Sequence, residues 1–308
     1  MKIFSGFLII AVCLIFAGCG TETATDDYEG PPFYFLVLSA DAGDGAYEND
    51  ELIKIDSGGM GRSMIFVNDS PVQVVGYWGD AFAIDDFVVP GKNTIRVEGA
   101  RTGSSYMKVL LVDSDTTING GTKCTEVVAK CRFDPEAETS TLEFDVPETF
   151  QPSAYEEFAQ DEALQKELDK QIEEYITTIV QYFRDLDLEG LNEFNGEILK
   201  MKDNPPSRLF EARYNGMLAA KKENEETYCN QDLKLDELNF DRKKIRIHKG
   251  PRSIFICRDI DDSFGSRHLL ECKVTNQDDE LTFFHVTRIL LIKINGKLYR
   301  AGRGSTWW

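Results

Sequence analysis

The stretch that decides the fold is residues 147–186, PETFQPSAYEEFAQDEALQKELDKQIEEYITTIVQYFRDL, because the apolar pattern changes within it. Two prolines between Pro147 and Ser153 mark a linker. From Ala154 onward apolar residues recur three and four positions apart, with charged residues between them. This spacing predicts a long amphipathic helix over residues 154–187. The expected fold class is therefore α+β, with an all-β sandwich before this stretch and an α+β domain after it.

The part before the linker, residues 33–150, contains short apolar or alternating runs separated by Gly, Asp, Asn and Pro. These four residue types favour turns. Short runs spaced roughly 8–12 residues apart predict the strands of a β-sandwich. The predicted strands are Phe33–Ser39, Glu51–Ile55, Ser63–Asn68, Val72–Tyr77, Ala81–Val89, Thr94–Glu98, Tyr106–Val112, Lys123–Cys131 and Thr141–Val146.

Two segments of this part carry a family resemblance. Ile65-Phe66-Val67-Asn68 reads as a "V-N" strand and Pro90-Gly91-Lys92-Asn93 as a "P-G-x-N" turn. Together they resemble the galactose-binding-like jelly-roll sandwiches, which implies a sandwich fold and an expectation of glycan binding. Tyr77 and Trp78 are the candidate residues for stacking on a sugar ring, and a buried aromatic pair at a strand end is the alternative interpretation.

The part after the long helix begins with two shorter helical patterns and continues as strands. Pro205-Pro206 opens the second helical pattern, where proline suits the first turn. Asn295-Gly296 between apolar runs predicts a two-residue hairpin. The predicted strands are Leu238–His248, Arg252–Ile260, Arg267–Thr275, Leu281–Ile294 and Lys297–Ala301.

Three helices followed by a sheet that closes on Ile294-Asn295-Gly296-Lys297-Leu298-Tyr299 resemble the nuclear transport factor two-like (SnoaL-like) cones. The resemblance covers residues 154–308 and implies helices packed on a twisted antiparallel sheet. In enzymes of this kind a pocket His or Asp acts as acid and base. His285, which shares a strand face with Phe283, is the candidate pocket residue for a small-molecule isomerase or hydrolase. A histidine satisfied by hydrogen bonds is the alternative interpretation.

The first residues of the chain have the composition of an export signal. Lys2 precedes an apolar run that ends in small residues, and the run is short for crossing a hydrocarbon core of about 30 Å. Phe16-Ala17-Gly18-Cys19 resembles the lipobox of bacterial lipoproteins, in which the cysteine is lipidated and cleavage falls just before it. This resemblance implies a signal peptide over residues 1–18 and a palmitate-type lipid anchor on Cys19.

Residues 19–32 then form the lipidated cysteine and a polar, flexible tether. Gly20 follows the cysteine, where an Asp would resemble an inner-membrane retention signal. The expected location is therefore the cell envelope, and the outer membrane, periplasmic or surface-facing, if the cell has two membranes. An ordinary secretory signal and an uncleaved anchor are the alternatives.

The net charge of the chain argues against nucleic acid as a partner. The 308 residues contain 53 Asp and Glu against 34 Lys and Arg, a net charge of −19. Nucleic-acid binding requires a basic surface, so no nucleic-acid partner is expected. The residues beyond 240 are basic overall, which predicts internal charge complementarity more readily than an anion site.

Five cysteines remain after Cys13 leaves with the signal and Cys19 takes lipid. Exported proteins meet oxidising conditions, so disulfides are expected between Cys124 and Cys131 and between Cys257 and Cys272. The second pair depends on pairing the strands Arg252–Ile260 and Arg267–Thr275. No cysteine or histidine cluster has zinc spacing, so no metal site and no cofactor are predicted.

No sequence motif of a hydrolase or metalloprotease is present. The predicted function is a lipid-anchored cell-envelope protein of binding or structural type, with a small molecule, a glycan or another protein as partner. The alternatives are an enzyme with a pocket around His285, and a sandwich that binds glycan through Tyr77 and Trp78.

Overall fold

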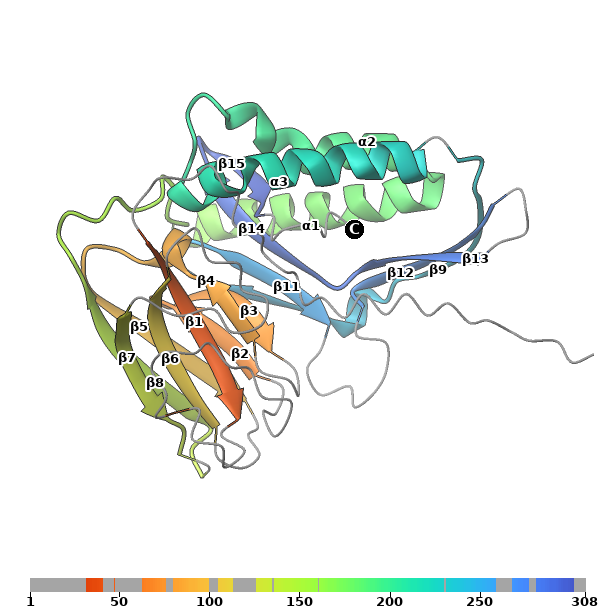
Figure 1. The fold of residues 1–308 in the computed structure, drawn as a ribbon. Helices are drawn as coiled ribbons and strands as arrows, with labels where there is room; N and C mark the ends of the chain where they lie inside the picture. The colour runs from red at the N-terminus through yellow and green to blue at the C-terminus, as the bar shows by residue number, and fades with distance from the viewer. Residues whose placement is uncertain are drawn as a thin grey trace, which may run out of the picture.

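The computed structural model describes residues 32–40, 47, 63–75, 80–99, 105–112, 126–134, 136–159, 161–229, 231–258, 268–276 and 281–301. Within these residues the fold is a mixture of α and β structure, as the sequence predicts. Three α-helices and four antiparallel sheets make up its regular elements. The helices lie together on one side of the molecule, above the strands of residues 234–300 (Figure 1).

Residues 33–146 form two four-stranded sheets, which we call the N-terminal region. One has the order β4-β1-β6-β7 and the other β3-β2-β5-β8. Their bounds are β1 Phe33–Ala40, β2 Ser63–Val67, β3 Ser70–Val75, β4 Asp80–Ala83, β5 Gly91–Gly99, β6 Ser105–Val112, β7 Glu126–Arg132 and β8 Thr139–Val146. Each predicted strand of this region that falls on described residues overlaps one of these strands, and Glu51–Ile55 lies outside them.

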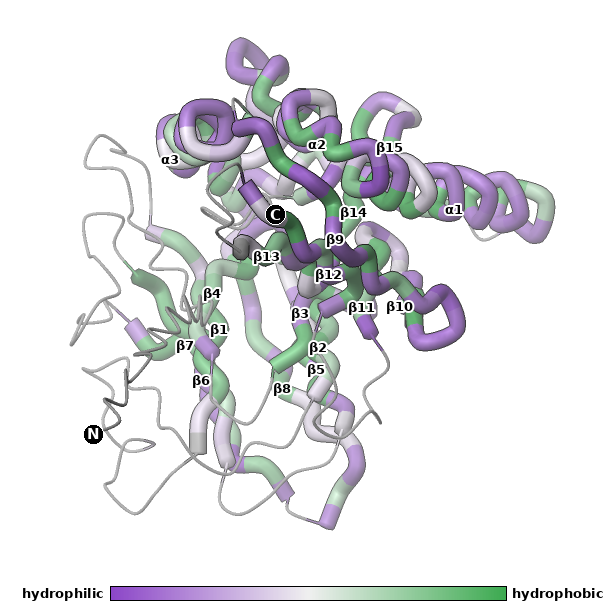
Figure 2. The backbone as a smooth tube through the Cα atoms, turned by 90° about the vertical axis from the view of Figure 1, so that its right-hand side faces the viewer, coloured by the Kyte–Doolittle hydropathy of each residue, from purple (hydrophilic) through white to green (hydrophobic). Residues whose placement is uncertain are grey.

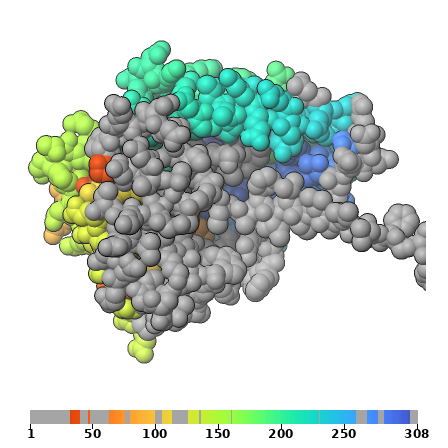
Figure 3. Space-filling model, in the orientation of Figure 1, coloured from red at the N-terminus to blue at the C-terminus, as the bar shows by residue number. Residues whose placement is uncertain are grey.

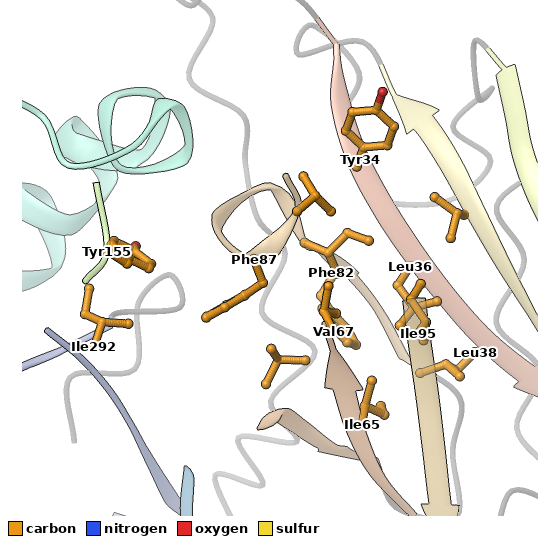
Figure 4. Packing of buried hydrophobic residues seen from close by; sticks show 14 of the residues in the cluster. Tyr34, Leu36, Leu38, Ile65, Val67, Phe82, Phe87, Ile95, Tyr155 and Ile292 are labelled. Atoms are coloured by element: carbon orange, nitrogen blue, oxygen red, sulfur yellow. The ribbon is translucent and has the colours of Figure 1, made fainter. Parts of the chain in front are cut away.

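The two sheets share a core made by one face of each. Leu36 and Leu38 of β1 belong to the same buried cluster as Ile65 of β2 and Ile95 of β5, and all four are fully buried. Figure 4 shows these side chains between the strands. Burying one such side chain contributes roughly 1.5–3 kcal/mol.

Asn68 and Asn93, which end the two segments that resemble galactose-binding-like sandwiches, connect neighbouring turns by hydrogen bonds. Asn68, at a positive φ of 48°, donates from Nδ2 to Asn93 Oδ1 (2.7 Å) and to the Phe87 carbonyl (3.0 Å). Buried Asn93 donates to the Val89 carbonyl (2.7 Å) and accepts from the Val89 amide (2.8 Å). The short side chains therefore satisfy backbone groups that the strands leave without ladder partners.

The helices are α1 Glu162–Asp185, α2 Leu188–Asn195 and α3 Arg208–Asn224, and the 3₁₀ segment η2, Gly196–Met201, follows α2. Asp161 caps α1 by accepting from the amide of Ala163, and Ser207 caps α3 by accepting from that of Phe210. Such caps satisfy amides that have no partner inside the helix. One face of α1 is buried, through Leu168, Ile172, Tyr175, Ile176, Ile179, Val180 and Phe183.

The prediction that the first helix begins at residue 154 is wrong. Residues 154–159 are not helical, because amides of this segment bond to other parts of the chain rather than along a helix. Ala154 donates to the Pro206 carbonyl (2.7 Å), Glu156 to Lys293 (2.8 Å) and Phe158 to Pro251 (2.6 Å). We call residues 154–159 the strap. Tyr155 and Phe158 are buried in it, which explains why an apolar pattern continues through a segment that is not helical.

Residues 234–300 form a three-stranded sheet of order β13-β12-β9 and a four-stranded sheet of order β10-β11-β14-β15. Together with residues 162–229 we call them the C-terminal region. The strand bounds are β9 Lys234–Asn239, β10 Ile245–Lys249, β11 Ile254–Arg258, β12 Leu270–Thr275, β13 Leu281–Val286, β14 Arg288–Ile294 and β15 Lys297–Arg300. Figure 3 shows the blue strands directly beneath the green-to-cyan helices.

The helices bury one face of these sheets. Ile172 and Phe183 of α1 share a core cluster with Ile256 of β11, Cys272 of β12 and Phe284 of β13. In Figure 2 helix α1 alternates between hydrophilic and hydrophobic bands, while β11 is mostly hydrophobic. The amphipathic helix is therefore matched to the sheets, as its sequence predicts.

Three strand predictions in this region need correction. The runs Leu238–His248 and Leu281–Ile294 are each broken, so that β13 and β14 belong to different sheets. The strands of Arg252–Ile260 and Arg267–Thr275 do not pair, because β11 lies between β10 and β14 while β12 lies between β13 and β9. The Asn295-Gly296 hairpin is confirmed, with positive φ at both residues and β14 paired to β15.

The two regions are packed against each other. Met64 and Phe66 of β2 form a buried cluster with Phe255 and Cys257 of β11. Gly250 lies at the contact, where a Cβ atom would stand 2.5 Å from the Asp69 carbonyl oxygen and 2.7 Å from Ser70 Cα. Glycine thus permits an approach that any side chain would prevent.

The contact between the regions continues into the main core. The buried cluster that fills the N-terminal region also includes Phe210 of α3 and Ile292 of β14. Figure 4 shows Phe87 between the sandwich strands and the Tyr155–Ile292 pair, and the rings of Phe87 and Tyr155 lie 6.0 Å apart. The hydrophobic core therefore runs across the predicted boundary at residues 150–154.

None of the described helices has the length and apolar character needed to cross a membrane.

Candidate functional site

The first candidate site is a cluster of two histidines and a glutamate on β12 and β13. Glu271 of β12 lies directly opposite His285 of β13, so the two side chains share one face of the sheet. His268 precedes β12, and its ring stacks on that of His285 with a centroid distance of 3.9 Å and an interplanar angle of 23°. Ligand atoms of the three side chains all lie within 4.8 Å of one another.

The opposite face of the same strands explains why this cluster is accessible. Cys272 and Phe284, the neighbours in sequence of Glu271 and His285, point into the core beneath the helices. Side chains alternate along a strand, so Glu271 and His285 point away from that core. About a third of each side chain is exposed, 31% and 34%.

The electrostatics of His285 favour a neutral ring. Partial burial lowers the pKa of His285, and the nearby Glu271 carboxylate acts in the opposite direction. The Nδ1 atom of His285 is buried and makes no hydrogen bond, with Glu271 Oε2 3.6 Å away. The ring of Phe283, itself 46% exposed, lies parallel to that of His285 at 6.0 Å. The site thus combines imidazole nitrogens, one carboxylate and an aromatic wall.

The second candidate site is an open cleft between α1, α2 and the β14–β15 hairpin, with a volume of about 340 Å³. Its walls carry aromatic rings from Tyr175, Phe194 and Tyr299. The rings of Tyr175 and Phe194 are 5.0 Å apart, which fixes one side of the cleft. The polar residues of the lining are Gln171, Glu174, Thr178, Asn195, Glu197, Lys297 and Arg300.

Two of the charged residues that line the cleft pair with each other, and a third pairs with a residue outside it. Lys297 Nζ lies 2.6 Å from Glu197, and Glu174 lies 3.6 Å from Lys170 outside the cleft. Arg300 approaches Asn195 Oδ1 at 3.5 Å, and burial lowers its pKa with Tyr175 acting in the opposite direction. A guanidinium in a partly dry cleft presents fixed donors to a carboxylate or another planar anion.

A third group of ionisable residues is buried at the junction of the two regions. Asp85 pairs with Arg208 (2.8 Å) and accepts from the Tyr34 amide (2.8 Å). Burial raises the pKa of Asp85 to about 7, with Arg208 acting in the opposite direction. Asp85 is only 3% exposed. A group this enclosed cannot meet a substrate, so we assign it to structure.

The adjacent residues extend this junction. Tyr155 donates to Asp86 Oδ2 (2.8 Å), and Arg252 donates to the Ser153 carbonyl (2.8 Å). Ser153 in turn donates to the Asp86 carbonyl (2.6 Å). Burial raises the pKa of both Asp86 and Tyr155. These bonds join the strap before α1 to the 3₁₀ turn η1, Asp85–Phe87, of the N-terminal region.

The structure places the predicted pocket residue His285 on the outer face of the β13-β12-β9 sheet. It does not line the cleft described above. The Glu271 carboxylate lies 3.6 Å from its Nδ1 atom, and both side chains are about a third exposed. Tyr77, Trp78, Cys19 and Cys124 lie outside the described residues, so the predictions that concern them are unchanged.

The predicted disulfide between Cys257 and Cys272 is wrong. Cys257 in β11 lies opposite Arg246 and Arg288, whereas Cys272 in β12 lies opposite Phe284 and Leu238. The two cysteines therefore belong to different sheets, and Cys272 is a free thiol. Burial raises the pKa of Cys272 to about 11, which keeps the thiol protonated.

Sequence reasoning missed Glu271, His268 and Arg300 as site residues. The predicted pairing of Arg252–Ile260 with Arg267–Thr275 places Glu271 beside the wrong strand, because β11 and β12 lie in different sheets. The two histidines are far apart in the chain and meet only because β12 and β13 pair. The one available signal was the presence of His268 and Glu271 at the start of one predicted strand and His285 within the next.

Comparison with known proteins identifies no matching family model, and no curated protein or solved structure matches the chain.

Proposed function

We propose that this protein is a lipid-anchored cell-envelope protein of the binding type. In this proposal Cys19 carries the lipid and residues 19–32 form the tether. Residues 33–150 form a β-sandwich, and residues 154–308 form a cone-like α+β domain that binds a small molecule. The lipobox-like Phe16-Ala17-Gly18-Cys19 supports the anchor. Two or more acyl chains are needed for stable attachment, and lipoproteins of this kind carry them.

The observation that carries the binding function is the cleft beside Arg300. Small-molecule sites are concave, largely apolar and oriented by a few polar groups. The cleft supplies three aromatic rings, and its lining contains the two cations Lys297 and Arg300. This combination favours a small carboxylate with an apolar or aromatic body. Asn195 and Thr178 are further polar residues of the lining.

Benzoate and its neutral isostere benzamide test the cleft. We expect benzoate to perturb the NMR signals of cleft residues in the full-length protein held in detergent micelles, and benzamide to bind at least tenfold more weakly. Arg300→Gln should abolish the preference for benzoate, while Arg242→Gln, which changes an exposed arginine paired with Glu173, should keep it. Equal binding of the two probes, or perturbations outside the cleft, would contradict the proposal.

Labelled palmitate tests the anchor separately. We expect it to enter the wild-type protein and to be absent from a Cys19→Ala variant, which should also shift from the membrane fraction to the soluble fraction. Equal labelling of the two proteins would contradict the lipoprotein interpretation. It would not affect the proposal that the cleft binds a small carboxylate.

A further inference from the structure

The outer face of β12 and β13 holds a second group of residues with the chemistry of a site. Imidazole nitrogen and carboxylate oxygen are the ligands by which proteins bind zinc and related divalent metals. His268, Glu271 and His285 bring one such atom each to within 4.8 Å of the others. The position of two of them is fixed by the sheet, since Glu271 and His285 are register partners.

The distances are close to those of a bound ion. With bonds of roughly 2.1 Å, a tetrahedral metal holds its ligand atoms roughly 3.4 Å apart. His285 Nδ1 and Glu271 Oε2 are already 3.6 Å apart. The rings of His268 and His285 are stacked, so the lone pairs of their nitrogens lie in nearly parallel planes. For both lone pairs to point at one metal ion, the imidazoles must turn about their Cβ–Cγ bonds. The partial exposure of the three side chains leaves room for that rotation.

A surface ion pair alone does not explain the arrangement. A partly exposed His–Glu pair is worth at most about 1 kcal/mol. It requires neither a second imidazole nor a ring face at 3.9 Å. Moreover, the Nδ1 atom of His285 is buried without a hydrogen bond, which is costly unless another group meets it. A metal ion satisfies this nitrogen and the neighbouring carboxylate at once.

We propose that His268, Glu271 and His285 bind one divalent transition-metal ion, with zinc as the ion that this ligand set favours. Three protein ligands leave a fourth position open to water, the arrangement of catalytic rather than purely structural zinc sites. Glu271 and His285 point away from the helix-covered core. Phe283, stacked parallel to His285, forms a wall beside it.

This inference is independent of the proposed function. The metal site lies on β12 and β13, whereas the cleft is lined by α1, α2, η2 and the β14–β15 hairpin. Loss of benzoate binding in the Arg300→Gln variant should therefore leave metal binding unchanged. Loss of metal binding should likewise leave the preference for benzoate intact.

Calorimetric titration with ZnCl₂ tests the site on the full-length, untagged protein in detergent, after treatment with a chelator. We expect one zinc ion per chain. His285→Ala and Glu271→Gln should each weaken binding at least tenfold. His248→Ala is the matched control, because His248 lies on β10 in the other sheet, and its zinc binding should equal that of the wild type.

Three results of the titration would overturn the proposed metal site. Absence of zinc binding by the wild type, retention of full affinity in Glu271→Gln, or loss of binding in His248→Ala would do so. Glu271→Gln preserves the shape of the side chain, so it remains informative if His285→Ala fails to fold. Cobalt provides a second readout, since a site of this kind gives the intense visible absorption of four-coordinate Co²⁺. Only weak, six-coordinate spectra would indicate an adventitious ion.

Discussion

The N-terminal and C-terminal regions bury their sheets in different ways. In the N-terminal region two sheets face each other across a shared core, and β2 is also covered on its other side by β11. In the C-terminal region the helices cover one face of the sheets, and the outer face of β13-β12-β9 carries the partly exposed Glu271 and His285. Both candidate sites, the cluster on β12 and β13 and the cleft, therefore lie in the C-terminal region.

The largest expected effect comes from breaking the junction that makes the two regions one body. Arg208→Ala leaves the Asp85 carboxylate buried without its partner, and such losses cost about 3–5 kcal/mol. Urea denaturation should show this decrease in the free energy of unfolding. Arg242→Ala, which removes an exposed pair with Glu173, should cost less than about 1 kcal/mol. Equal effects of the two substitutions would show that the junction does not couple the regions.

The same junction predicts a dependence of stability on pH. Because burial raises the pKa of Asp85 from 3.8 to about 7, the folded chain binds more protons than the unfolded chain between these values. The stability that Asp85 contributes is present below pH 3.8 and is lost as the pH rises through 7. Arg208 and the Tyr34 amide, which face the carboxylate, oppose the effect of burial, and the pKa of about 7 is the net result.

Asp85→Asn isolates this contribution. The free energy of unfolding of the wild type, minus that of the variant, should fall by up to about 4 kcal/mol as the pH is raised across this window. Denaturant titrations of both proteins at several pH values measure the difference. A difference that is constant, or that grows with pH, would contradict the assignment.

A smaller decrease in the free energy of unfolding is expected from breaking the turn network of the N-terminal region. Asn93→Ala removes the hydrogen bonds to Val89 and to Asn68 and leaves buried backbone groups unsatisfied, which costs about 2–3 kcal/mol. Thermal denaturation should show a lower midpoint than that of Lys92→Ala, whose side chain makes only an exposed pair with Glu143. Similar midpoints would mean that the turn network does not stabilise this region.

The smallest effect is expected on the open face of the C-terminal region. Phe283 is 46% exposed, so Phe283→Ala should change the free energy of unfolding by less than about 0.5 kcal/mol. The same substitution at Phe284, its buried neighbour, should cost about 3–5 kcal/mol. If the two variants were equally unstable, the face would be covered and the contrast between the regions would fail.

The sequence predicted the elements whose cause is local. The Asn295-Gly296 turn needs only two residues at positive φ, and the long helix needs only its own apolar stripe. The start of that helix was missed, because residues 154–158 bond to Pro206, Lys293 and Pro251, and these contacts depend on the tertiary fold.

The candidate site was predicted only in part, for a related reason. Charge matching and alternation favoured a pairing of Arg252–Ile260 with Arg267–Thr275, but any two alternating strands of suitable length satisfy that test. The true partner of β12 is β13, and this pairing brings Glu271 to His285. His285 was singled out from the sequence, whereas its two neighbours depend on strand order, which short-range patterns do not encode.

The outer face of β12 and β13 carries His268, Glu271 and His285, which we propose to bind one divalent metal ion. Anomalous diffraction at the zinc absorption edge, from crystals of the zinc-loaded protein, tests this claim most directly. We predict one strong peak within roughly 2.0–2.2 Å of His268, Glu271 and His285. No peak there, or a peak of equal strength at His248 or in the N-terminal region, would contradict the claim.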